Sequence, residues 1–173
     1  MFHIPKPKQL LVALLASFLG LSSCTEVECP LDTVVVMTCG LYDASSHSQL
    51  TLYDTLTVNA VGATVPLLNR AVGKQSFGLS VSYQNDVDTL LFCFSNAAGD
   101  AATDTIFLAH TNAPHFESVD CPTSMFHQLT RVAWTRREPT GQLRAVDSVA
   151  IVRSTVDYED IENIRVFLRT AAQ

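Results

Sequence analysis

Short apolar runs with a two-residue period dominate the chain after residue 33 and restrict the folds open to it. These runs are rich in β-branched and aromatic residues, and clusters of Asn, Gly, Pro and other polar residues separate them. At Leu56, Val58 and Ala60 the apolar side chains occupy alternate positions, which places them on one face of a strand. We therefore predict an all-β fold, an antiparallel immunoglobulin-like β-sandwich of about seven or eight strands.

Eight segments carry the strand signal, and no segment shows a convincing helical stripe. The expected strands are 34–42, 50–61, 77–83, 89–95, 105–110, 126–135, 148–155 and 163–169. Segment 89–95 is apolar on both faces, which indicates a central or covered strand. The polar segments 97–103 and 136–146 are expected to be exposed loops of a single domain that spans residues 34–173.

The N terminus has the order of regions typical of an export signal. Lys6 and Lys8 precede an uncharged apolar run over residues 10–21. That run is too short for a membrane-spanning helix, which needs about 20 apolar residues, but it suits the core of a signal peptide. We predict a signal peptide over residues 1–23.

The residues that follow, Leu21-Ser22-Ser23-Cys24, resemble the lipobox of bacterial lipoproteins. The resemblance implies cleavage before Cys24, a diacylglyceryl thioether on its thiol and a fatty acyl group such as palmitate on its new amino group. Residues 24–33 would then be a lipidated N terminus and linker. Two or three acyl chains anchor a protein to a membrane stably. The alternative is ordinary secretion, with Cys24 as a plain disulfide cysteine.

Charge and the first mature residues bear on location and partners. Loss of Lys6 and Lys8 leaves 9 basic and 17 acidic residues, a formal net charge of −8, which argues against nucleic acid as a partner. Glu26 and Glu28 resemble the acidic signal that displays Bacteroidota-type lipoproteins on the outer face of the outer membrane. We expect a cell-envelope protein, lipid-anchored in the outer membrane, and leave the periplasmic face and the cell surface open.

Four cysteines remain besides Cys24, and four cysteines allow three pairings. Cys29 and Cys121 each precede a proline and the start of a strand, whereas Cys39 and Cys93 lie inside strands. Pairing residues in like contexts gives a Cys29–Cys121 disulfide. The same logic makes Cys39 and Cys93 either a disulfide between strands or a buried thiol pair.

No catalytic or metal-binding motif is complete. Ser80 lies in Gly78-Leu79-Ser80-Val81-Ser82, which lacks the final glycine and the following helix of a hydrolase nucleophile elbow. His110, His115 and His127 could meet Asp120 or Glu117 around zinc, but their spacing matches no zinc motif. The sequence predicts no catalytic residue, no metal site and no cofactor.

Two acidic patterns invite a calcium interpretation. The runs 85–88 and 157–162 lack the glycine and distal glutamate of a calcium loop, so we interpret them as solvated turns. An Asp-Thr or Asp-Ser pair also opens five apolar runs, at Asp32, Asp54, Asp88, Asp104 and Asp147. We expect these aspartates to bind nearby backbone N–H groups at turns rather than to converge on a cation.

Most aromatic residues fall within expected strands, where core packing accounts for them. They are Tyr42, Tyr53, Phe77, Phe92, Phe94, Phe107, Phe126, Trp134 and Phe167. Trp134 borders the charged loop 136–146 and is the candidate for binding a partner. Any function is expected on the surface from Trp134 to Arg144 or on an exposed sheet edge.

Several features together resemble a small family of uncharacterised Bacteroidota lipoproteins. They are the lipobox, Cys121-Pro122 before a strand with Phe126, Val146-Asp147-Ser148-Val149, and the closing run over residues 163–168. That family carries no activity to transfer. The sequence therefore predicts a non-enzymatic, membrane-anchored module that binds an envelope protein or glycan. The alternative is a periplasmic or surface hydrolase with a dispersed Ser/His/Asp site.

Overall fold

The computed structural model describes Cys29 and residues 34–139 and 141–170. The chain divides into two units, Met1–Pro30 and Leu31–Gln173. Except for Cys29, the predicted signal peptide, Cys24 and residues 25–33 lie outside the described residues. All the described strands belong to the second unit.

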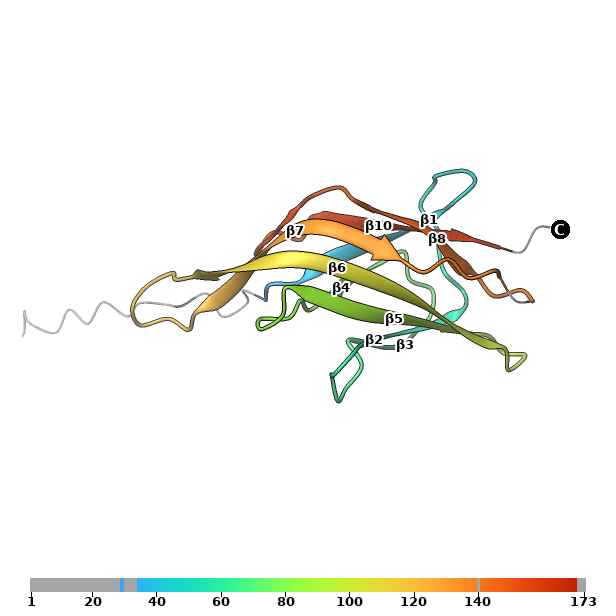
Figure 1. Ribbon diagram of the computed structural model, residues 1–173, viewed down its shortest axis with the longest axis horizontal. Helices are drawn as coiled ribbons and strands as arrows, with labels where there is room; N and C mark the ends of the chain where they lie inside the picture. Colours follow the sequence, from blue (N-terminus) through green and yellow to red (C-terminus); the bar gives the residue numbers. More distant parts are fainter. Residues whose placement is uncertain (1–28, 30–33, 140, 171–173) are drawn as a thin grey trace, which may run out of the picture. The chain divides into compact units, whose positions relative to one another are not determined.

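Ten strands form two sheets that pack face to face (Figure 1). The four-stranded sheet has the order β4-β1-β10-β8 and the six-stranded sheet has the order β3-β2-β5-β6-β7-β9. The strands are β1 Met37–Asp43, β2 Thr55–Ala60, β3 Leu68–Ala71, β4 Ser76–Leu79, β5 Val87–Ser95, β6 Ala101–His115, β7 Ser124–Trp134, β8 Ala145–Ile151, β9 Thr155–Val156 and β10 Glu162–Arg169. The predicted all-β sandwich is confirmed, with more strands than expected.

Alternating side chains from both sheets make one core. In β5, Leu90, Phe92 and Phe94 point inward and are at most 1% exposed, while Leu91 and Cys93 between them face outward. From the opposite sheet, Leu41, Ile164, Val166 and Leu168 are fully buried. The period of two seen in the sequence is therefore the period of burial, as a half-buried strand requires.

The first and last strands are neighbours and run parallel, whereas the other strand pairs are antiparallel. Their pairing runs from Thr38 opposite Glu162 to Asp43 opposite Leu168. The side chain of Asn163 supports the pairing of β1 with β10 near its first residues. Its Oδ1 accepts the Thr38 N–H at 2.9 Å, and its Nδ2 donates to the Thr155 carbonyl at 2.7 Å.

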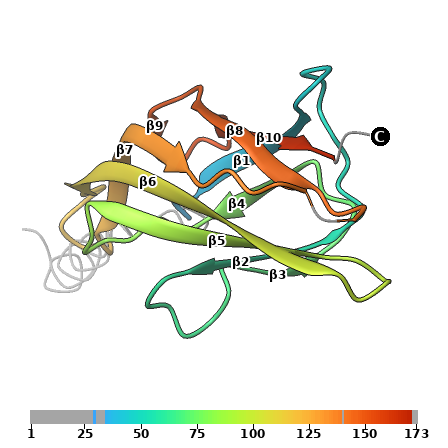
Figure 2. The same ribbon diagram turned by 45° about the vertical axis from the view of Figure 1, so that its right-hand side comes forward.

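Most strands differ from the expected boundaries by a few residues, and three differ more fundamentally. The two shortest, β3 and β9, were not predicted as separate strands, because four and two residues are too few to show a period; the expected strand 148–155 joined the end of β8 to the first residue of β9. Strand β6 spans 15 residues and includes Pro114, well beyond the expected end at residue 110. Past Ala109 it pairs only with β7, so the two strands project as a hairpin beyond the end of β5 (Figure 2).

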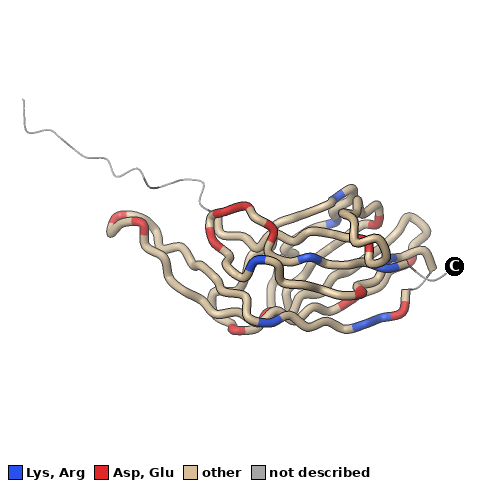
Figure 3. Tube along the Cα trace, turned by 90° about the horizontal axis from the view of Figure 1, so that it is seen from above, with Lys and Arg blue, Asp and Glu red and all other residues tan. Residues whose placement is uncertain are grey.

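The hairpin tip is acidic (Figure 3). Between β6 and β7 the chain carries Glu117 and Asp120 and no lysine or arginine. Phe116 and Val119 of the same turn are 66% and 100% exposed. No helix within the described ranges is long and apolar enough to cross a bilayer.

The cysteines separate into two classes, and one expected pairing is wrong. Cys29 and Cys121 are disulfide-bonded, in agreement with the prediction that these two are oxidised. Cys39 and Cys93 carry free thiols and form no disulfide. The reason is direction: Cys39 points into the core from β1, whereas Cys93 faces outward from β5, where Thr103 Oγ1 lies 3.4 Å from its sulfur.

We predict that a peptide map without reduction links Cys29 to Cys121 and leaves Cys39 and Cys93 unlinked. Burial raises the pKa of the Cys39 thiol far above its ordinary value, so the reactive thiolate is suppressed. An alkylating reagent should therefore modify Cys93 in the native protein and Cys39 only after unfolding. A peptide that joins Cys121 to Cys39 or Cys93 would contradict this assignment.

Candidate functional site

Trp134, the predicted binding residue, lies at the end of β7 and is half-buried against the core. Its indole N–H donates to the Asp147 carbonyl on β8 at 2.8 Å. The ring therefore joins the end of the six-stranded sheet to the edge strand of the four-stranded sheet. This geometry gives Trp134 a structural contact and does not present it as an exposed aromatic platform.

The loop that follows Trp134 is held by a buried ion pair. Asp104 is 0% exposed, and its Oδ1 lies 2.9 Å from Nε of Arg137. Its Oδ2 accepts the Val146 N–H at 2.9 Å, at the start of β8. The Arg137 guanidinium also donates to the Arg144 carbonyl at 3.0 Å. Asp104 thus holds loop 136–146 near both of its ends, through Arg137 and Val146, so the loop is not freely exposed.

Asp54, Asp88 and Asp104 accept backbone N–H groups, and for Asp54 and Asp104 the donor lies far away in the sequence. Asp54 accepts the N–H of Arg144, 90 positions away, and Asp104 accepts that of Val146, 42 positions away. Asp88 accepts the Ser82 N–H at 2.9 Å, while Asp147 pairs with Arg136 and Arg169. Asp32 lies outside the described residues. The expected local role is therefore wrong for Asp54 and Asp104, which connect separate elements, and for Asp147, which binds arginine side chains.

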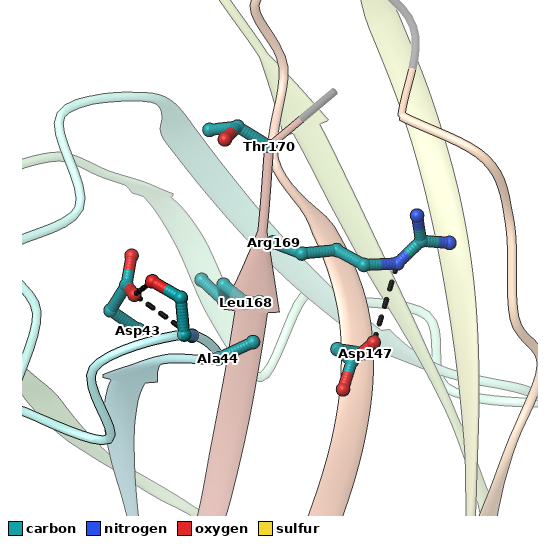
Figure 4. Close-up of a pocket in the computed structure, with 7 residues that line it drawn as sticks. Asp43, Ala44, Asp147, Leu168, Arg169 and Thr170 are labelled. Atoms are coloured by element: carbon teal, nitrogen blue, oxygen red, sulfur yellow. Dashed lines mark hydrogen bonds and ion pairs between the residues drawn. The ribbon is translucent and has the colours of Figure 1, made fainter. Parts of the chain in front are cut away.

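A cavity of about 280 Å³ lies beside β10 at the same end of the sandwich (Figure 4). Asp43 and Asp147 line it, and Arg169 reaches toward Asp147 with Nε 3.5 Å from Oδ1. The hydroxyl of Ser45, the N–H of Ser46 and Arg144 hold the pKa of Asp43 far below its usual range, against the effect of burial. These charges are already paired within the fold.

Two of the candidate histidines meet inside the sandwich. His110 and His127 are 1% and 2% exposed, and their rings meet edge to face with centroids 5.5 Å apart. Asn112 Oδ1 lies 2.9 Å from Nδ1 of His110 and 2.7 Å from Nδ1 of His127. The Asn112 amide is oriented by its Nδ2, which donates to the Asn85 carbonyl at 3.2 Å, so both Nδ1 atoms are donors.

The outer nitrogens of the two rings differ in their surroundings. Nε2 of His110 lies 3.4 Å from Oδ2 of Asp88. Both Nε2 atoms are buried, and neither has a hydrogen-bond partner among the described residues. The exposed ring of Tyr83 stacks on His127 with centroids 5.9 Å apart. Burial, and then repulsion from His110, lowers the pKa of His127 to about 4 despite the opposing charge of Asp88.

Within the described residues, Ser80 forms no hydrogen bond with His110 or His127. It follows β4 and, with Ser82 and Asp88, lines a cavity of about 320 Å³. Ser82 Oγ accepts the N–H groups of Gln84 and Asn85. Within the described part of the chain, no histidine nitrogen bonds a serine or cysteine.

His115 lies apart, on the projecting hairpin. Its ring stacks on Phe126 with centroids 4.2 Å apart, and Tyr158 packs edge-on against Phe126. Nε2 of His115 lies 3.0 Å from Oε1 of Glu117.

The carboxylates of the acidic run 157–162 bind protein side chains. Arg153 binds Asp157 and Glu159, and Thr38 donates to Asp160. Across the described ranges, no three His, Cys, Asp or Glu side chains form a group that could hold a metal ion.

One pocket with mixed polar and apolar lining was not predicted. Tyr53, Arg70 and Gln142 help to line a cavity of about 610 Å³ between the start of β2, β3 and the turn between β5 and β6. We name it the Tyr53–Arg70 pocket. Tyr53 was expected in the core but is 81% exposed. Gln142 belongs to loop 136–146, so the loop that was expected to carry function borders this pocket.

The sequence has a family relationship over most of the sandwich. Residues 55–168 match the model of DUF6452, a family of unknown function. The chain belongs to this family. No curated protein and no solved structure matches the chain.

The part of the chain shared with DUF6452 runs from the start of β2 almost to the end of β10. It includes both buried histidines, the Asp104–Arg137 pair and Arg70. Strand β1 and Tyr53 precede it. The family match therefore covers the whole six-stranded sheet and three strands of the other.

Asp104→Asn should destabilise the protein strongly. The amide can still accept the Val146 N–H, but Arg137 loses its buried counter-charge, and breaking such a pair costs about 3 to 5 kcal/mol. The free energy of unfolding in urea measures this loss. The matched control is Glu138→Gln, because Glu138 is 85% exposed where it pairs with Arg169 and its loss should leave that free energy nearly unchanged. Equal losses in the two variants would refute a structural role for the buried pair.

His127 should make stability depend on pH. The unfolded chain takes up a proton near pH 6.5, whereas folded His127 does so only near pH 4, so its contribution is complete above pH 6.5 and falls as the pH drops toward 4. The loss is at most about 3 kcal/mol. Urea unfolding between pH 7 and pH 4.5 should show a steeper decline for the wild type than for His127→Asn, with His115→Asn as control. Parallel declines in wild type and His127→Asn would contradict the assignment.

Proposed function

We propose that the protein is a lipid-anchored module of the bacterial cell envelope that binds a partner and catalyses no reaction. One observation carries the proposal: the lipobox residues Leu21-Ser22-Ser23-Cys24 stand directly after an apolar export segment and about ten residues before a β-sandwich. A short linker between a lipidated cysteine and a folded domain is the arrangement of a tethered extracytoplasmic domain.

The chemistry of the sandwich supports binding rather than catalysis. His110 and His127 direct their Nδ1 atoms at Asn112, and Asp104 and Asp54 accept backbone N–H groups. A periplasmic hydrolase would need Ser80 or another nucleophile at a histidine nitrogen. These polar groups of the interior serve the fold, whereas Tyr53 and Arg70 at the end of the sandwich are exposed to solvent.

The same N-terminal residues support the proposed location. Glu26 and Glu28 after Cys24 support placement in the outer membrane of a Bacteroidota-type cell, on its periplasmic face or on the cell surface. The oxidised state of Cys29 and Cys121 suits an extracytoplasmic compartment. The partner would be an envelope protein or glycan that meets the exposed loops.

Mass spectrometry of the mature protein from a bacterial host should find Cys24 as the first residue, with a diacylglyceryl thioether and an acylated amino group. Cys24→Ala should abolish labelling by an alkyne analogue of palmitate and move the protein out of the membrane fraction. Cys93→Ser, which changes another free thiol, should behave like the wild type. A mature chain that begins at Ser23, or at an unmodified Cys24, would overturn the anchor.

Cross-linking in intact cells followed by affinity purification tests the binding role separately. The anchored wild type should capture a reproducible partner that Cys24→Ala does not. Identical recoveries from the two proteins would mean that the tether has no part in partner choice.

A further inference from the structure

We infer that the Tyr53–Arg70 pocket binds an oligosaccharide that bears carboxylate groups, with Arg70 on a carboxylate and Tyr53 against a sugar ring. The inference deepens the proposed binding role and rests on it. It names the surface and the chemical class of the ligand.

An irregularity in β3 sets the backbone conformation of Arg70. Leu56 pairs with Ala71 and Val58 pairs with Leu68, so β3 has one residue more than β2 between the two pairs. Arg70 lies in this bulge with φ of 47°, a left-handed conformation that favours glycine. Bulges redirect side chains and are common beside functional sites. A non-glycine residue held in this conformation costs stability, which points to a function for its side chain.

The Arg70 guanidinium has no partner within the described part of the fold. Arg136, Arg137, Arg144, Arg153, Arg165 and Arg169 all form ion pairs. Arg70 is exposed, and among the described residues it forms neither an ion pair nor a side-chain hydrogen bond. The planar guanidinium group of Arg70 is therefore available for a carboxylate, which it can bind through two parallel hydrogen bonds.

Tyr53 and Val72 supply apolar surface beside that cation. Tyr53 is 81% exposed and Val72 is 54% exposed, and both line the pocket. A flat aromatic ring with a hydroxyl at its edge suits a ligand that has an apolar face and a polar rim. A sugar ring has both, because its C–H groups lie on its faces and its hydroxyls at its edge.

The remaining lining is rich in neutral hydrogen-bonding groups. Thr55, Ser95 and Gln142, whose side chains carry hydroxyl and amide groups, line the cavity. Asp54 is the acidic member of the lining, and one of its oxygens already accepts the Arg144 N–H. The cavity of about 610 Å³ is within the size range of ligand sites. A single unpaired cation, beside one carboxylate that is already hydrogen-bonded and several neutral polar groups, fits a uronic acid better than a phosphate-rich ligand, which needs several cations.

The test measures binding of oligogalacturonates to the purified full-length mature protein in detergent micelles by titration calorimetry. Maltooligosaccharides of the same length are the neutral comparison, and a poly-glutamate peptide is the acidic comparison without sugar rings. We expect oligogalacturonate to bind at least tenfold more tightly than either. Its affinity should fall as salt concentration rises, because the contact with Arg70 is charged.

Four variants separate binding from folding. Arg70→Gly and Tyr53→Ala should each weaken oligogalacturonate binding at least tenfold, and Arg70→Lys should lie between them and the wild type. Arg70→Gly should unfold at the same or a higher temperature, because glycine adopts φ of 47° without strain. Arg131→Ala is the matched control, since Arg131 is also exposed and outside the ion pairs of the described chain.

Each other outcome overturns the inference. Absence of oligogalacturonate binding, equal affinity for the neutral sugar, or unchanged affinity in Arg70→Gly would exclude this site or this ligand class. Preference for poly-glutamate would replace the sugar with an acidic peptide. The anchor is assessed independently, because the mass of the mature N terminus from the same preparation reports lipidation whether or not sugar binds.

Discussion

The buried carboxylate of Asp104 is the interaction on which the end of the sandwich depends. It lies on β6 of the six-stranded sheet, yet it accepts the N–H of Val146 on β8 of the other sheet. The same carboxylate holds Arg137, which in turn binds the Arg144 carbonyl. Arg144 then donates its own N–H to Asp54. A single buried charge thus sets the path of the loop between the sheets and places Gln142 at the Tyr53–Arg70 pocket.

The general fold could be predicted from local pattern, because each long strand shows in its own residues which side is buried. The assignment of strands to sheets could not. Cys39 and Cys93 both lie within strands, and only the three-dimensional packing shows that one points inward and the other outward. Asp54 and Asp104 resemble turn residues for the same reason, since their partners are far away in the sequence.

The candidate site was harder to predict than the fold, because it depends on departures from regular structure. Strand β3 has four residues and a bulge, so no period marks it. Arg70 carries no local sign that its backbone is left-handed, unlike a glycine at such a position. Tyr53 stands before β2 rather than within it, and its exposure follows from that offset. The loop from residue 136 is predicted to carry function; in the structure it contributes Gln142 to the lining of a neighbouring pocket, whereas Trp134 packs against the core.

The parallel pairing of β1 with β10 has a kinetic consequence. Thr38 and Asn163 are hydrogen-bonded although 125 positions separate them, and β1 lies in the middle of its sheet between β4 and β10. The four-stranded sheet cannot close until the C-terminal strand is present. Contacts between distant residues slow folding, since the entropy of closing a long loop is lost before the contact forms. The four-stranded sheet of this chain is therefore completed only when β10 joins β1, whereas the antiparallel pairs of β5, β6 and β7 can form without β10.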